Sequence, residues 1–278
     1  MMDGIDKSDR RGGGGDRRRS DRRAGDRREG DRRDGACAST AFQAEREDMA
    51  AAFRWTARHG MHEGIANHFS LAVSDDGSRF LLNPYGVHFS RMKASDLLLL
   101  DAREEPEGMG DAVDPTAYAI HGALHRNLPQ ARCVLHLHPK YATVLASLAD
   151  STIPPIDQNS MRFYERVAID EGYDGMGLGD EAERLSRTLG NRSVLMMGNH
   201  GVMVVGETVA RAFDEMVYLE RACETVVTAY MTGQPLRRAS HEVASKTARQ
   251  WAEYPAFGEK HFAALRAILD EEEPDYRQ

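Results

Sequence analysis

Residues 134–147 read VLHLHPKYATVLAS, an apolar run that carries two histidines, His136 and His138, just before a proline. The apolar run predicts a buried strand over 131–138, and the proline then suits the first turn of a helix over 139–150. Side chains two residues apart on a strand share a face, so both imidazoles are expected on the same side of a sheet. Two such nitrogens can take adjacent corners of a metal's coordination sphere. An isolated pair of this kind is more often a structural feature of a half-buried strand.

A third histidine strengthens the metal hypothesis. Asn199, His200 and Gly201 form a predicted short turn between two apolar strands. A side chain in such a turn can face a cleft. A third imidazole would complete a set of three nitrogens and leave open positions for water or substrate. Taken alone, His200 is also more often an ordinary turn residue, so the hypothesis depends on the three histidines together.

The rest of the chain mixes strand-like and helix-like segments. Asp114 and Pro115 suit the N-cap and the first position of a helix. Because strands and helices do not alternate strictly, the pattern favours an α/β fold in which helices cover a sheet of mixed strand directions. The predicted helices cover 42–60, 115–129, 180–190 and 207–233, and the predicted strands cover 69–74, 79–82, 97–101, 193–197 and 202–206.

The first 36 residues differ in composition from the remainder, because Arg, Asp and Gly dominate and apolar residues are almost absent. Nothing in such a segment offsets the entropy lost on ordering, so it is predicted to be a disordered tail. The chain holds 36 Lys and Arg against 44 Asp and Glu, a net charge of −8, and the excess acid lies after the tail. This acidic balance argues against nucleic-acid binding.

The cysteines and the apolar runs bear on the compartment. Cys37, Cys133 and Cys223 show no paired spacing. They therefore argue against a disulfide framework or a zinc finger and favour reduced thiols in a cytoplasmic protein. No apolar run approaches the roughly 20 residues that a membrane helix needs, and the N-terminus lacks the apolar core of a secretory signal. We therefore expect no membrane partner.

Longer motifs give the chain a family resemblance. The strings are HGALHRNLPQARCVLHLHPKYATVLASL at 121–148 and VLMMGNHGVMVVGETVARAFDEMVYLERAC at 194–223, with the loops NHFS at 67–70 and LNPYGVHF at 82–89. Together they resemble the class II aldolase/adducin head-domain family over about residues 42–232. The resemblance implies a three-layer α/β/α sandwich with a central, largely antiparallel sheet. It also suggests a family domain over 37–235, followed by a C-terminal helical extension over 236–278.

The resemblance also implies a metal centre and an assembly. In the family, the histidine pair and the histidine of the NHG loop bind one divalent metal, and the matching residues here are His136, His138 and His200. Zinc is the expected ion, with Fe(II) or Mn as alternatives. Family members are commonly homotetramers with sites near subunit contacts, so a homo-oligomer is expected.

The sequence departs from the sugar-phosphate aldolases of this family at two places. Ala117 occupies the position of the glutamate that serves as acid/base in those enzymes. Their phosphate-binding Gly-Asn-x-Ser loop corresponds to NHFS, where His68 replaces the Asn, and only Thr116 retains a hydroxyl from the Ser pair. Both features resemble the adducin-like branch and argue against a phosphorylated sugar as substrate.

Candidate site residues come from the matching loops and their neighbours. Tyr141, His68 and His121 are candidates for the acid/base role, as are His88 and Tyr164. His121 can equally point into the core from a helix. The predicted substrate-binding residues are Asn67, Ser70, Asn83, Gly86, Thr116 and Tyr164.

The charge of the site suggests the substrate. Three neutral histidines would leave a divalent metal with its full charge, which favours a small anionic chelating substrate such as a carboxylated hydroxy or oxo compound. A metal there would support retro-aldol cleavage and decarboxylation equally. We therefore predict a metal-dependent lyase. The alternatives are a non-haem iron oxygenase or oxidative decarboxylase on the same scaffold, and a non-catalytic adducin-like interaction module.

Overall fold

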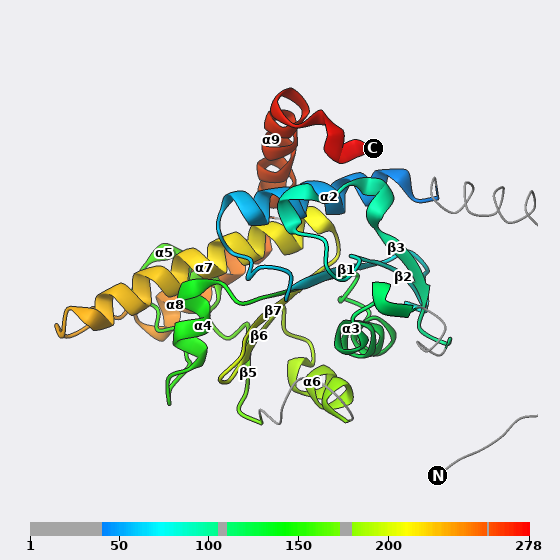
Figure 1. Ribbon diagram of the computed structural model, residues 1–278. Coiled ribbons are helices and arrows are strands. Elements are labelled where there is room, and N and C mark those ends of the chain that lie inside the picture. Colours follow the sequence, from blue (N-terminus) through cyan, green and yellow to red (C-terminus); the bar gives the residue numbers. More distant parts are fainter. Residues whose placement is uncertain (1–40, 105–109, 173–179, 255) are drawn as a thin grey trace, which may run out of the picture. The chain divides into compact units, whose positions relative to one another are not determined.

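The computed structural model describes residues 41–104, 110–172, 180–254 and 256–278 (Figure 1). The tail predicted over 1–36 lies outside the described residues. Residues 42–278 form one compact unit. In the described part of the chain, no helix is both long enough and apolar enough to cross a membrane.

Among the described residues, a seven-stranded sheet runs through this unit in the order β3-β2-β1-β4-β7-β6-β5 (Figure 1). Every neighbouring pair is antiparallel except β5 and β6. The predicted, largely antiparallel sheet is thereby confirmed. The strands are β1 (His68–Ala72), β2 (Arg79–Leu82), β3 (Leu98–Asp101), β4 (Cys133–Leu137), β5 (Val167–Asp170), β6 (Val194–Met197) and β7 (Gly201–Gly206).

Helices cover both faces of the sheet, which confirms the three-layer α/β/α sandwich (Figure 1). One apolar core joins the sheet to α2, α4, α7 and α9. A second core joins the opposite face to α3 and α6. The helices are α2 (Gln43–Arg58), α3 (Pro115–Asn127), α4 (Lys140–Ala146), α5 (Gln158–Arg162), α6 (Glu181–Leu189), α7 (Val209–Met231), α8 (His241–Ala252) and α9 (Ala256–Glu272).

Strand β4 lies at the centre of the sheet, and its side chains alternate between the two cores. Cys133 and Leu135 belong to the core under α2 and α7, whereas Val134 belongs to the core under α3 and α6. Because the side-chain period of a strand is two, His136 shares the face of Val134. The sequence alternation therefore places the first histidine of the pair on the α3 side of the sheet.

Helix α3 begins as the sequence predicts. The Asp114 carboxylate caps it by accepting from the backbone N–H groups of Thr116 at 2.8 Å and Ala117 at 3.1 Å. Pro115 occupies the first helical position, where a missing N–H costs nothing. The start of α3 packs on the β2–β3 edge of the sheet, because Ala117 and Tyr118 share an apolar cluster with Phe80, Leu82 and Leu100.

Two segments differ from the sequence expectation. The helix expected over 139–150 ends at Ala146, and Ser147 is its C-cap. The stretch 151–169, expected to be irregular and then extended, contains the short helix α5 before β5. In α5, Asp157 and Ser160 form a reciprocal capping box, a local signal that apolar periodicity does not detect.

The C-terminal helices pack onto the sandwich. Helix α9 contacts α7, and Trp55 of α2 donates from Nε1 to the Leu265 carbonyl at 2.9 Å. Arg54, also on α2, forms ion pairs of 2.8 Å with Glu273 and 3.0 Å with Asp275. The domain limits proposed at residues 235 and 236 remain predictions.

Candidate metal centre

Three histidines meet at the end of the central strands. His136 is the fourth residue of β4, His138 follows that strand directly, and His200 lies in the turn between β6 and β7. One ring nitrogen of each lies within 4.8 Å of the others. The Nε2 atoms of His136 and His138 are 3.0 Å apart. The residues that sequence spacing proposed as metal ligands therefore converge on one point.

The turn that carries His200 depends on its local residues. Asn199 adopts a left-handed backbone with a φ of 58°, a conformation that Asn tolerates better than most residues. A Cβ on Gly201 would lie 2.5 Å from Cδ2 of His138 and 2.7 Å from the Leu137 carbonyl oxygen. Only glycine lets β7 begin this close to the His138 ring, so the sequence GNHG is suited to bringing the third imidazole to the pair.

The Nδ1 atoms of the first two histidines have partners away from the centre. His136 Nδ1 lies 3.1 Å from the Val202 carbonyl oxygen, and His138 Nδ1 lies 2.6 Å from Glu63 Oε2. A carbonyl or carboxylate oxygen accepts, so Nδ1 carries the proton in both neutral rings. Their Nε2 lone pairs then face each other. A divalent cation fits between such nitrogens, and outer carboxylate or carbonyl partners of this kind are typical of metal-binding histidines.

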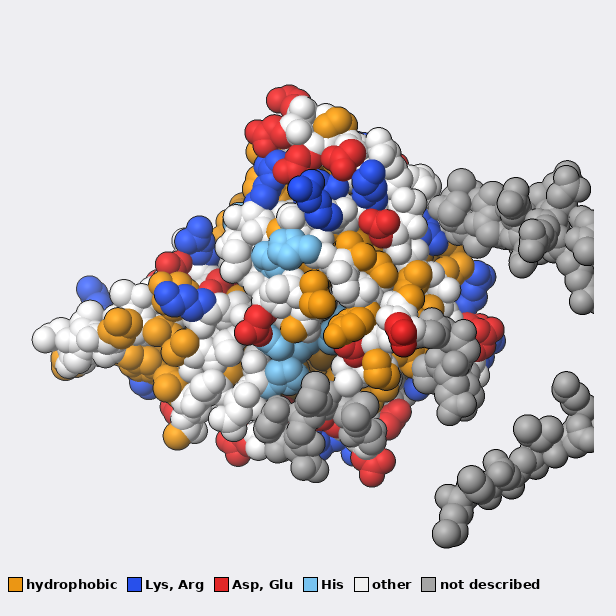
Figure 2. Space-filling model, viewed as in Figure 1, with side chains coloured by type: hydrophobic (Ala, Val, Ile, Leu, Met, Phe, Trp, Pro, Cys, Tyr) orange, Lys and Arg blue, Asp and Glu red, His pale blue; other side chains and the backbone are white. Residues whose placement is uncertain are grey.

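Burial keeps these imidazoles in the form that a metal needs. It lowers the pKa of His136 well below the usual value, with the neighbouring histidines adding to the effect. Burial also lowers the pKa of His200 to about 4, with His138 as a second cause. Metal ligation requires neutral imidazole, so both side chains are ready to bind at neutral pH. On the face of the molecule seen in Figure 2, histidine side chains reach the surface in two nearby groups.

A second set of buried imidazoles lies behind the triad. His68 is paired with His136 across the β1–β4 ladder, and their ring centroids are 4.8 Å apart. His68 Nδ1 lies 2.7 Å from Nε2 of His121, which is fully buried on α3. His121 therefore faces the sheet, and it reaches the candidate metal centre through His68.

The proposed substrate-binding residues lie in the loops before β1 and after β2 and at the start of α3. Asn67 accepts at Oδ1 from the Glu63 backbone N–H at 2.6 Å. Asn83 accepts at Oδ1 from the Phe69 backbone N–H at 2.9 Å, and Thr116 donates from Oγ1 to Asp114 at 2.6 Å. These bonds shape the loops, whereas contact with a substrate remains a prediction for each of them.

Three further predicted residues have other surroundings. Gly86 has a φ of 87°, which suits glycine in the loop after β2. Ser70 is fully buried, and its hydroxyl lies between two imidazoles of α3. The Tyr164 hydroxyl lies 3.0 Å from Nδ1 of the exposed His241.

Tyr141 and His88 are also outside the triad. Tyr141 lies in the first turn of α4, donates its backbone N–H to Glu220 at 2.9 Å, and lines a small cleft with His59 and Met61. His88 lies 2.9 Å from His62 through the two Nε2 atoms. Their proposed acid/base roles remain predictions.

Two residues beside the centre were not proposed from the sequence. His125 lies one helical turn after His121, and this spacing of four places both on the buried face of α3. That spacing was a usable signal. Glu63 lies in the loop before β1, and its contact with His138 joins residues 75 positions apart. No local pattern indicates such a pair.

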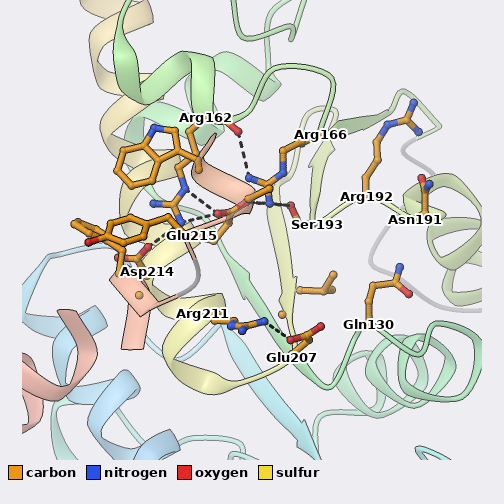
Figure 3. A pocket seen from close by; sticks show the side chains of 17 residues that line it. Gln130, Arg162, Arg166, Asn191, Arg192, Ser193, Glu207, Arg211, Asp214 and Glu215 are labelled. Atoms are coloured by element: carbon orange, nitrogen blue, oxygen red, sulfur yellow. Dashed lines mark hydrogen bonds and ion pairs between the residues drawn. The ribbon is translucent and has the colours of Figure 1, made fainter. Parts of the chain in front are cut away.

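A cavity of about 270 Å³, larger than the cleft beside Tyr141, lies between α5, α7 and α8 and includes none of the three histidines (Figure 3). Arg162 there forms ion pairs of 2.7 Å with both Asp214 and Glu215, and Arg166 pairs with Glu215 at 2.8 Å. The Arg162 guanidinium also lies over the ring of Trp251, 5.2 Å from its centroid. Much of the charge in this cavity is already paired, so the histidine site is the stronger functional candidate.

Comparisons with known proteins agree with this geometry. Residues 47–227 match the protein-family model described as class II aldolase and adducin N-terminal domain. The decarboxylase NovR of Streptomyces niveus is 30% identical over 72% of this chain and 75% of its own, and human beta-adducin is 29% identical over 80% of this chain and 33% of its own. A crystal structure of an aldolase II superfamily protein from Pseudomonas syringae is 31% identical, with a TM-score of 0.77 over 85% of this chain and 96% of its own.

Proposed function

The chain belongs to the class II aldolase and adducin family, and from this premise we propose that it is a metal-dependent lyase. Its reaction would be aldol or retro-aldol cleavage, or decarboxylation, of a small carboxylated hydroxy or oxo compound. The observation that carries the proposal is the convergence of three imidazoles, with ligand nitrogens within 4.8 Å of one another. The similarity to a protein named as a decarboxylase gives further support.

The donor set suggests both the metal and the substrate. His136, His138 and His200 would hold one divalent ion, and imidazole nitrogens suit zinc, with Fe(II) or Mn as alternatives. When bound, the ion would supply a Lewis acid for the carbonyl or hydroxyl oxygen of the substrate. In the described part of the chain, the cluster contains no carboxylate. An anionic chelating substrate would therefore complement the charge of the site.

The proton-transfer group must differ from that of the sugar-phosphate aldolases. Ala117 is buried at the start of α3, and its methyl group cannot exchange a proton. His68 is the best-placed alternative, because it faces His136 across the ladder and is linked to α3 through His121. We propose His68 as the residue that contacts the reacting end of the substrate, with Tyr141 as the second candidate.

Metal analysis of the full-length protein tests the proposal. We expect one divalent ion per chain, lost when His136 or His138 is replaced by Gln. His241→Gln is the matched control, because this histidine is exposed on α8 and should leave the metal content unchanged. Absence of metal from the wild type, or retention of metal in the triad variants, would contradict the proposal and favour a non-catalytic, adducin-like role.

A reaction assay then distinguishes the chemistry. The metal-loaded protein would be incubated with 2-hydroxy and 2-oxo acids, and carbon–carbon cleavage would be followed by NMR. Strict dependence on Fe(II) and O₂ would select the oxygenase alternative. We also propose a homotetramer in the cytoplasm, for which light scattering would give about four times the 31.0 kDa chain mass.

A further inference from the structure

Behind the triad, five groups form one buried hydrogen-bonded row. It starts at the Ala131 carbonyl oxygen, which lies 2.6 Å from Nδ1 of His125. Nε2 of His125 lies 2.7 Å from the Ser70 hydroxyl, which in turn lies 2.5 Å from Nδ1 of His121. The row ends with the 2.7 Å contact between His121 Nε2 and His68 Nδ1. All four side chains are buried, so solvent does not compete for these bonds.

The carbonyl gives the row a direction. Because a carbonyl oxygen only accepts, His125 must carry its proton on Nδ1. A neutral His125 then accepts at Nε2 from the Ser70 hydroxyl, whose single proton is thereby used. Ser70 must in turn accept from Nδ1 of His121. Burial favours the neutral ring at each position, as the lowered pKa of His121 and of His125 also indicates.

The same reasoning fixes the last ring of the row. A neutral His121 with its proton on Nδ1 accepts at Nε2, so His68 donates from Nδ1. The Nε2 atom of His68 is then left with a bare lone pair. It forms no hydrogen bond within the described residues, and its ring lies 4.8 Å from that of His136. The row therefore presents an acceptor, not a donor, beside the triad.

We infer that this buried row holds His68 as a hydrogen-bond acceptor beside the metal centre and thereby selects ligands with a hydroxyl donor, that is, 2-hydroxy acids over 2-oxo acids. The inference rests on the proposed metal-dependent function and names its substrate class. His68 is the ligand-contacting residue, whereas His121, Ser70 and His125 are positioning residues that act through it.

The selection follows from matching donors to acceptors. A chelating 2-hydroxy acid offers its hydroxyl proton to Nε2 of His68. A 2-oxo acid places a carbonyl lone pair at the same position, and two acceptors cannot pair. A site built to hydrogen-bond a hydroxyl discriminates against an analogue that lacks it, because a group of the site is then left unpaired. The buried row prevents His68 from adapting by moving its proton to Nε2.

The tautomer of His68 can be read directly by ¹⁵N NMR on the full-length, zinc-loaded protein. His68→Gln assigns the signal by its disappearance. We expect a protonated Nδ1 and an unprotonated Nε2. A protonated Nε2 would overturn the inference, as would coupling of ¹¹³Cd to His68 in cadmium-substituted protein, because that would make it a fourth metal ligand. Metal content is measured first, so that a protein without metal counts against the proposed function rather than against the tautomer.

Ligand binding tests the selection itself. Calorimetry on the zinc-loaded protein would compare lactate with pyruvate and mandelate with phenylglyoxylate. We expect the hydroxy acid to bind about tenfold more tightly within a pair. Ser70→Ala interrupts the row and should remove most of that preference, together with the single tautomer in the NMR spectrum. Ser74→Ala is the matched control, because its hydroxyl lies in the β1–β2 turn beside Asp76.

The outcomes are separable. Equal affinity for the two members of each pair, no binding of either pair, or a preference that survives in Ser70→Ala would overturn the inference even if zinc is bound. If Ser70→Ala does not fold, the wild-type tautomer and the wild-type preference still decide. A preference for hydroxy acids together with a protonated Nε2 would assign the selection to another group and reject this role for the row.

Discussion

At the scale of single residues, Glu63 contacts the proposed metal ligand His138 and is not itself one of the three proposed ligands. Its carboxylate lies 2.6 Å from Nδ1 of His138, and the side chain is 68% exposed. A carboxylate behind a ligating imidazole orients the ring and increases its basicity. Because the glutamate is exposed, its contribution to folding stability is expected to be small. A substitution of Glu63 can therefore change the metal affinity while leaving the folding stability almost unchanged.

Glu63→Gln is therefore predicted to lower zinc affinity about tenfold, with little change in the urea midpoint. The amide keeps the size of the side chain but removes the charge. Competition with a chromophoric chelator measures the affinity. Glu165→Gln is the matched control, because Glu165 also lies near an exposed histidine, at 3.9 Å from His241. Equal zinc affinity in the Glu63 variant and the wild type would show that the carboxylate does not support the ligand.

Gly201 affects the same histidine sterically, because the absence of a side chain leaves room for the His138 ring. A Cβ at this position would lie 2.5 Å from His138 Cδ2 and 2.7 Å from a backbone oxygen, so the ring or the strand must shift. Gly201→Ala is predicted to reduce zinc affinity by about tenfold or more and to destabilise the fold by about 1–3 kcal/mol. Chelator competition and urea unfolding measure the two effects. Wild-type zinc affinity in this variant would mean that the turn can relax without moving the ligand.

At the scale of elements, local patterns account for much of the site. The alternation in β4 places His136 on a defined face, and the Asp114–Pro115 cap fixes where α3 begins. The turn residues Asn199 and Gly201 permit the tight connection that carries His200. Each of these features depends on neighbours within a few residues, which is why the sequence alone was sufficient to predict them.

Other parts of the site depend on pairings over long sequence distances. Ser70 meets His125 across 55 residues, and Glu63 meets His138 across 75. Their partners are set by strand order and by the packing of α3 on the sheet, and periodicity carries no information about either. For this reason the sequence could nominate Ser70 as a substrate ligand without indicating that two imidazoles flank its hydroxyl.

The packing of α3 against β1 also makes stability depend on pH. Burial lowers the pKa of His125 to about 4 in the folded state, against about 6.5 in an unfolded chain. At a pH between these two pKa values, His125 is protonated in the unfolded chain and neutral in the folded chain. Stability should therefore be fully present above about pH 6.5 and fall as the pH drops toward 4. Burial lowers the pKa of His68 to about 4 as well, so the two effects have the same sign.

Urea unfolding at pH 7 and pH 5 tests this dependence. His125 is expected to account for about 2 kcal/mol of the difference in unfolding free energy. His125→Gln should flatten the pH dependence by that amount, whereas His241→Gln should leave it unchanged because that imidazole is exposed. Equal slopes for the wild type and His125→Gln would mean that the buried ring becomes protonated without loss of structure.

At the scale of the whole molecule, the cavity of Figure 3 joins α5 to α7 and α8. Arg162 joins a cluster of charged and aromatic side chains there: it forms ion pairs with Asp214 and Glu215, and its guanidinium lies over the ring of Trp251. Both carboxylates are buried, at 2% and 7% side-chain exposure. A buried charge without its partner is strongly unfavourable, so this cluster is expected to hold helix α8 against the sandwich.

Arg162→Met tests whether the cavity is structural. The variant leaves two buried carboxylates with fewer cations, although Arg166 still pairs with Glu215 and His261 with Asp214. We predict a loss of about 3–5 kcal/mol in unfolding free energy, with the zinc content of the folded protein unchanged. Urea unfolding and metal analysis on the same preparation measure both. Stability equal to that of the wild type would contradict the structural role of the cluster. Loss of zinc without loss of stability would instead link this cavity to the histidine centre.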